Sequence, residues 1–305
     1  MKKTTWPYNK KFAFTIVDDT DEGTTEKCVP IYNFLYDNRY LTTKTVWPLS
    51  PIGARISGGE SLEDVPYRQF ILNLQHRGFE IALHGVADES STRERVIKGF
   101  NFFNQVLGHY PNIHVNHFGQ KDCLYWGHKR FNGLIKFFYS LKQKRTYCGD
   151  ENNSKYFWGD ICKKHIKYVR NFTFYDINTL NMDPFMPYCD DKKPYVNNWF
   201  SSSDGSGTSR LTSLLSEKNQ DRLCEEGGAC IVYTHFGTID LNTRLKELLT
   251  RLAGQAGWFV PATTLLDHIG SQHTVRPLGK TAISTLQIKW LLSQLAIKTK
   301  KRWSH

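Results

Sequence analysis

The sequence predicts an α/β fold, an irregular TIM-like (β/α) barrel of seven or eight mostly parallel strands. Short apolar runs, typical of buried strands, alternate with longer stretches of helical periodicity, which is the pattern of βαβ units. A length of 305 residues suits one such barrel. Several of the predicted strands end in polar residues, and in a parallel barrel these ends meet on one face.

The first predicted strand is the clearest of these elements. Residues 12–17 are six apolar or β-branched residues without a break, which is typical of a strand buried on both faces, and Asp18 and Asp19 follow at once. Residues 20–23 then supply turn formers. One alternative is that Asp18 or Asp19 only caps the next helix, although two adjacent carboxylates exceed the needs of one cap.

The later elements follow from periodicity and stop signals. The helix predicted at 61–78 opens on Ser61 with Asp64 three residues later, a capping-box pattern, and closes on Gly78. Helical spacing also predicts helices at 24–40, 91–107 and, as one or two helices, 125–145. Further strands are predicted at 42–48, 79–84, 113–117, 169–178, 196–203, 229–235 and 258–261.

The last part of the chain is predicted to form a helix with a basic tail after the barrel. We expect the barrel to occupy residues 1–270 and a C-terminal helix with a basic tail to occupy 271–305. Residues 281–297 have helical apolar spacing, and Lys298, Lys300, Lys301 and Arg302 follow directly. Such a helix either packs on the outer wall of the barrel or rests on an anionic membrane with its cations at the phosphates.

Composition narrows the function classes. A net charge of +11 favours anionic partners, but zinc-finger spacings and RNA-recognition motifs are absent, so specific nucleic-acid binding is not expected. Seven scattered cysteines without CxxC spacing fit reduced thiols. No stretch has the form of a signal peptide or a membrane span. We therefore expect a cytoplasmic protein, with peripheral contact at the inner face of the membrane as one alternative.

The residues at the strand ends predict a metal site. A single histidine there is more often structural, but carboxylates and imidazoles from several strands together suit a divalent metal such as zinc. The residues at these strand ends are Asp18, Asp19, His84, Asn116, His117, Asp176, Ser203, Asp204 and His235.

Three motifs in the right order resemble the polysaccharide deacetylases of carbohydrate esterase family 4. The family's strand ending T-F-D-D-G is matched by residues 15–19. Its Gly-hydrophobic-Glu-Ile run before a histidine is matched by residues 78–84. Its late strand ending Leu-x-His is matched by residues 231–235, and its closing strand by residues 257–261. The likeness covers residues 10 to 270 and implies a (β/α) barrel with a metal-dependent deacetylase site.

The resemblance also implies roles for individual residues. Asp18 matches the general base, Asp19 and His84 match metal ligands, and His235 matches the general acid. The chain departs from the family at Asp88, where a second histidine is expected, and His117 is then the better third ligand.

Two further positions depart from the family pattern. Residues 116–119 replace the family's Arg-Pro-Pro-x-Gly, so its arginine partner for the base is missing there, and Thr20 replaces a glycine. Asp88 and Asp176 remain candidates for binding or supporting the metal.

The resemblance implies a hydrolase that removes an acyl group, acetyl in the first instance, from an amide nitrogen of a sugar or polysaccharide precursor. Trp126 and Trp158 are candidates for substrate binding, because aromatic faces stack on sugar rings, although aromatic residues are more often core. Asn116, at a predicted strand end, is a third candidate. One alternative is hydrolysis of another non-peptide C–N bond on a small polar molecule. Another is a non-catalytic barrel that binds an acidic glycan.

Overall fold

The computed structural model describes residues 4–273 and 275–302, with side chains described up to residue 295. Its strands are β1 (Phe12–Asp18), β2 (Thr43–Val46), β3 (Glu80–Leu83), β4 (Ile113–His114), β5 (Tyr168–Phe174), β6 (Asn198–Asp204), β7 (Ala229–Thr234) and β8 (Gly257–Phe259). Its α-helices are α1 (Thr25–Asp37), α2 (Val65–His76), α3 (Arg93–Leu107), α4 (Gly133–Lys142), α5 (Gly159–His165), α6 (Thr179–Met182), α7 (Thr208–Leu214), α8 (Glu217–Glu226), α9 (Thr243–Ala253), α10 (Ala262–Ser271) and α11 (Lys280–Arg302). Short 3₁₀ turns lie at η1 (Pro7–Asn9), η2 (Gly127–Arg130) and η3 (Phe236–Thr238).

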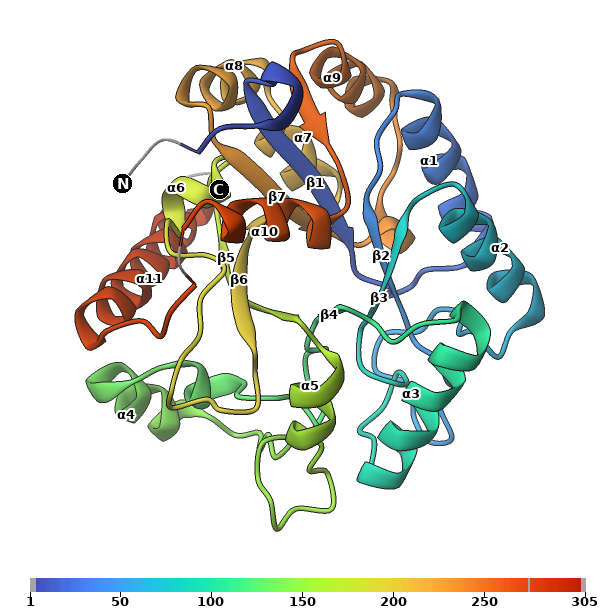
Figure 1. The fold of residues 1–305 in the computed structure, drawn as a ribbon, viewed down its shortest axis with the longest axis vertical. Coiled ribbons are helices and arrows are strands. Elements are labelled where there is room, and N and C mark those ends of the chain that lie inside the picture. Colours follow the sequence, from blue (N-terminus) through green and yellow to red (C-terminus); the bar gives the residue numbers. More distant parts are fainter. Residues whose placement is uncertain (1–3, 274, 303–305) are drawn as a thin grey trace.

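The predicted barrel is confirmed. β1 to β7 pair in sequence order, and β1 closes the ring by pairing with both β7 and β2. All of these pairings are parallel, and β8 adds to the first half of β1. The helices surround the ring (Figure 1). Every residue of β1 is buried, as its unbroken apolar run predicts.

One end of the barrel is closed by α10, which lies across the front of the ring in Figure 1. The backbone N–H of Ala262 donates to Thr43 Oγ1, and that of Thr263 donates to Glu80, so α10 is fastened to the starts of β2 and β3. The opposite end of the barrel, where the strands end, is not covered by α10 and is therefore the end at which we look for a site.

Some element boundaries differ from the prediction. The helix expected from Ser61 begins at Val65, because Ser61 donates its N–H to Asp64 Oδ2 at 2.8 Å and forms a turn before the helix. Pro66 in the first turn suits that later start, since a proline there has no N–H to leave unpaired. β4 has two residues where five were expected, and the chain leaves the sheet before His117.

The C-terminal helix packs on the barrel wall. Leu286 is buried, and the Trp290 ring lies 5.2 Å from Phe131 and 5.8 Å from Phe172, centroid to centroid. None of the described helices has the length and hydropathy needed to cross a membrane. The basic cluster from Lys298 onward lies outside the described side chains, and the division at residue 270 stays a prediction.

Candidate metal centre and catalytic site

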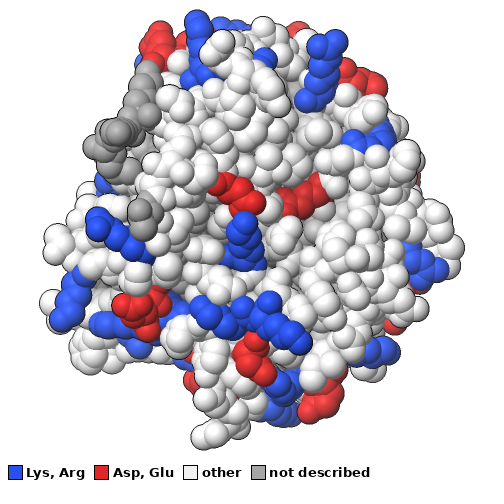
Figure 2. Space-filling model, viewed as in Figure 1, with Lys and Arg blue, Asp and Glu red and all other residues white. Residues whose placement is uncertain are grey.

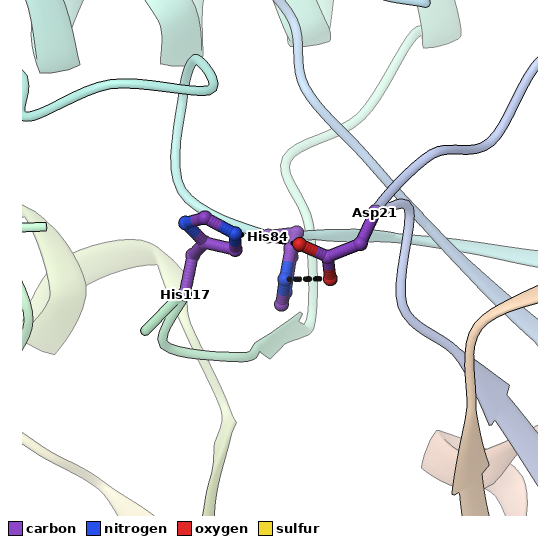
Figure 3. Close-up of side chains that lie close together, drawn as sticks. All are labelled: Asp21, His84 and His117. Carbon is purple, nitrogen blue, oxygen red and sulfur yellow. Dashed lines mark hydrogen bonds and ion pairs between the residues drawn. The ribbon is translucent and has the colours of Figure 1, made fainter. Parts of the chain in front are cut away.

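One carboxylate lies between two imidazoles at the end of the barrel where the strands finish. Asp21 occupies the turn after β1, His84 directly follows β3, and His117 lies just beyond β4. Asp21 Oδ2 is 3.0 Å from His84 Nε2, and Asp21 Oδ1 is 2.6 Å from His117 Nε2 (Figure 3). The Asp21 side chain is 15% exposed and both imidazoles are almost fully buried.

These three side chains fit a divalent metal. One ligand atom from each lies within 4.8 Å of the others. Two imidazole nitrogens and a carboxylate oxygen form a donor set typical of catalytic zinc, whose tetrahedral ligands lie about 3.3 Å from one another. The Nε2 atoms of His84 and His117 face the carboxylate, and their Nδ1 atoms are buried without a hydrogen-bond partner among the described residues.

A second carboxylate lies beside this cluster, held by an arginine. Asp19 accepts two hydrogen bonds from Arg170 of β5, one of them 2.9 Å long between Nη1 and Oδ1. The Arg170 guanidinium also lies 4.6 Å from the centre of the Tyr233 ring. The arginine partner that the sequence lacks at residues 116–119 is thus supplied by a different strand.

His235 lies next to both carboxylates. Its Nε2 atom is 3.3 Å from Asp21 Oδ2 and 4.0 Å from Asp19 Oδ2, and its side chain is 23% exposed. Burial works to lower the pKa of His235, but the hydrogen bond to Asp21 and the charge of Asp19 outweigh it and raise that pKa. Burial likewise works to raise the pKa of Asp21, but the histidines around it hold that pKa well below its ordinary value.

The structure places Asp18 outside this cluster. It is fully buried and forms an ion pair with Lys44 of β2, with Nζ 2.7 Å from Oδ2. Tyr32 donates its hydroxyl to the same oxygen, and the backbone N–H of Phe236 donates to Oδ1 at 2.8 Å. Burial raises the pKa of Asp18, against the effect of these partners.

This geometry favours other roles for two of the carboxylates than those the family resemblance implies. Asp18, expected as the general base, has both oxygens engaged beneath the site and no exposure to solvent. Asp19, expected as a metal ligand, has both oxygens held by Arg170, although it also lies within 4.8 Å of ligand atoms of Asp21 and His235, and Asp21 is the carboxylate between His84 and His117. His84, His117 and His235 do come together as expected.

The two further acidic candidates lie apart from the metal cluster. Asp88 accepts hydrogen bonds from the backbone N–H groups of Ser57 and Gly58, and Gly58 in turn accepts one from Glu22, next to Asp21. Asp88 thus supports the turn that carries Asp21. Asp176 pairs with Arg222 of α8 at 3.0 Å and does not approach the cluster.

The candidates for substrate binding also have other contacts. Asn116 fastens its own loop, since it accepts from the Leu124 N–H and donates to the Leu124 carbonyl. Trp158 is 2% exposed and donates to the Asp122 carbonyl, so its ring faces are not available to a sugar. Trp126 is partly exposed, lines a cavity of about 260 Å³ and carries the Arg130 guanidinium 4.2 Å from its ring centre.

Three important residues were missed, although the sequence held signals for two of them. Lys44 and Arg170 are the single charged residues within strands that are otherwise uncharged, and a charge inside a buried strand requires a partner. Asp21 was assigned to a turn, and nothing in the sequence alone distinguishes it from Asp19 as a ligand.

Comparisons with known proteins agree with this architecture. No family model and no curated protein sequence matches the chain. Among solved structures, a Mycobacterium smegmatis protein assigned as a polysaccharide deacetylase superposes with a TM-score of 0.52 at 15% identity, over 92% of this chain and 98% of that one. A probable polysaccharide deacetylase from Pseudomonas aeruginosa superposes with a TM-score of 0.52 at 12% identity, over 88% and 94%. The fold is that of the polysaccharide deacetylases.

The polysaccharide-deacetylase fold is not confined to one kind of enzyme. The allantoinase Puue also superposes with a TM-score of 0.52 at 12% identity, over 88% of this chain and 93% of that one. At such low identities the superpositions establish the shared fold, while residue roles depend on the geometry of the site itself.

Proposed function

We propose that the protein is a metal-dependent hydrolase that removes an acetyl or similar acyl group from an amide nitrogen of a sugar or polysaccharide precursor. The observation that carries the proposal is the Asp21 carboxylate between His84 and His117, with Asp19 and His235 beside it. This arrangement combines a metal site with two separate groups for proton transfer.

The proposed chemistry divides among these residues. A divalent ion held by Asp21, His84 and His117, with zinc as our choice, would supply a water of lowered pKa and polarise the acyl carbonyl. Asp19, oriented by Arg170, accepts the proton that the attacking water loses. His235 donates a proton to the amine nitrogen as the C–N bond breaks.

A small polar amide is the second candidate substrate. The similarity to an allantoinase, named for the small molecule allantoin, is as strong by TM-score as the similarity to the polysaccharide deacetylases. The same residues would hydrolyse its C–N bond. Release of acetate from N-acetylated sugar oligomers supports the first substrate class, whereas turnover of allantoin without acetate release supports the second.

Metal content tests the site before any substrate is known. Elemental analysis of the purified protein should find about one zinc-like ion per chain, and the Asp21→Asn variant should bind it at least tenfold more weakly. Asp176→Asn is the matched control, because it removes a carboxylate that lies apart from the cluster. Equal metal retention in both variants, or no metal in the unaltered protein, would refute the proposal and favour a non-catalytic barrel.

A further inference from the structure

Two neighbouring helices expose apolar side chains to solvent. On α4, four such residues recur at the spacing of one helical face: Leu134 is 76% exposed, Phe137 57%, Phe138 59% and Leu141 68%. On α11, Ile288 and Leu292, one turn apart, are 51% and 60% exposed. A helix on the surface of a water-soluble barrel normally turns its apolar face inward.

The inward faces of these helices are already occupied. Ile135 of α4 packs against the core, and the Tyr139 ring lies 4.5 Å from Phe131. On α11, Leu286 and Trp290 serve the same purpose. The outward residues therefore add nothing to this packing, and each helix is apolar on two sides.

The two exposed stripes form one continuous surface. The Asn132 N–H, just before α4, donates to Gln287 of α11 at 3.3 Å. Between the helices lies a hollow of about 660 Å³, whose wall includes Leu134 from one stripe and Ile288 from the other. We call this combined surface the α4–α11 face.

The helices of the α4–α11 face and the residues that flank them carry several cations. Lys136, Lys142, Lys144, Arg145 and Lys280 are exposed, and within the described part of the chain none of them forms an ion pair. The sequence has no Asp or Glu from residue 127 to 149 or from 268 to 305.

Two acidic residues border the hollow on this surface. Asp190 and Asp191 border it, and Asp190 is paired with Lys193 at 2.9 Å. In Figure 2, Lys and Arg gather along the lower left edge, over α4 and the start of α11, although an acidic group also lies there.

We propose that the α4–α11 face docks on an anionic lipid bilayer, with its apolar side chains in the outer acyl region and its cations at the phosphates. Exposed aromatic and aliphatic side chains on helices that also carry Lys and Arg are what an interfacial helix requires. A second copy of the chain is the less suitable occupant, because two cationic faces repel one another. This inference concerns a membrane-binding surface of the protein and does not depend on the hydrolase proposal.

Vesicle binding tests the proposal without any enzymatic assay. The full chain should co-sediment with vesicles rich in phosphatidylglycerol, bind neutral phosphatidylcholine vesicles at least tenfold more weakly, and leave the anionic vesicles as salt is raised. Phe137→Ser combined with Phe138→Ser should weaken binding at least tenfold. The control is Val65→Ser combined with Ile97→Ser, which removes exposed apolar residues from α2 and α3, across the barrel in Figure 1.

Folding and self-association are measured on the same samples. Both double variants should keep the circular dichroism spectrum and melting temperature of the unaltered protein, since none of the four residues is buried. If Phe137→Ser with Phe138→Ser unfolds the protein, Ile288→Ser with Leu292→Ser replaces it. The proposal is overturned if the unaltered chain ignores anionic vesicles, if the control loses as much binding as the test variant, or if the chain instead dimerises through this face.

Discussion

Replacing Asp18 by Asn should damage stability far more than catalysis. The Asp18 carboxylate and the Lys44 ammonium are both fully buried, 2.7 Å apart. Burial works to lower the pKa of Lys44, but the Asp18 charge outweighs it and keeps that pKa above its ordinary value, so the ammonium stays charged. Asp18→Asn would leave this buried charge without its counter-ion.

The expected loss follows from measurements on other buried ion pairs. Removing one partner typically costs about 3–5 kcal/mol of unfolding free energy. The unfolding entropy of a chain of this length is about 0.64 kcal/mol/K, so the melting temperature should fall by about 5–8 °C. Turnover per folded molecule should fall by no more than about tenfold, because an asparagine oxygen still accepts the Phe236 N–H beside His235.

A double variant distinguishes the effect of an unpaired buried charge from the effect of changing the side chains at this position. Asp18→Asn with Lys44→Met removes both charges, so no uncompensated charge stays buried, and the new amide oxygen can still accept from Tyr32 or from the Phe236 N–H. Its melting temperature, measured by circular dichroism at neutral pH, should lie within about 3 °C of the unaltered protein. The reasoning is refuted if Asp18→Asn melts normally yet has no turnover, since that result would make Asp18 the general base that the family resemblance implies.

Three other variants test the roles proposed for Asp19 and His235 and the raised pKa of Asp122. Asp19→Asn should lower turnover by about 10²- to 10⁴-fold with metal retained, the range for loss of a general base; loss of the metal instead would make Asp19 a ligand. His235→Ala should also lower turnover and keep the metal, and a rate equal to that of the unaltered protein would remove His235 from the mechanism. Burial raises the pKa of Asp122 to about 7, so the folded state holds a proton that the unfolded chain releases, and stability should fall as the pH rises from about 4 to 7. Melting curves of Asp122→Asn should show less of this fall, and an equal fall would contradict the assignment.

The barrel could be predicted because its strands are buried on both faces. An unbroken apolar run such as residues 12–17 is rarely anything else when helical stretches flank it. The start of α2 and the length of β4 could not be predicted in the same way. Both depend on local hydrogen bonds, such as the turn between Ser61 and Asp64, which leave hydrophobic periodicity unchanged.

The histidines of the site were found for a related reason. His84 and His235 immediately follow strands, so their position on the functional face depends only on the strands being parallel. The carboxylates depend on more than that. The turn after β1 is closed by the Gly23 N–H donating to the Thr20 carbonyl, and Glu22 has a positive φ of 53°. That turn brings Asp21 over the barrel, and its geometry cannot be read from the order of the residues.

Charge pairing is the reason for proposing Asp21, among the neighbouring carboxylates, as the metal ligand. The register of β1 on β2 places Asp18 opposite Lys44, and Arg170 reaches Asp19 from β5. Each of the two adjacent carboxylates thus has its own buried cation, which is the condition for keeping a charge in the interior. Of the three carboxylates between residues 18 and 21, Asp21 is the one whose ion-pair partners in the described part of the chain are all imidazoles. Carboxylate and imidazole together are ligands that zinc takes. Lys44 and Arg170 thus pair with Asp18 and Asp19, and this pairing supports the proposal that Asp21 is the aspartate that binds the metal.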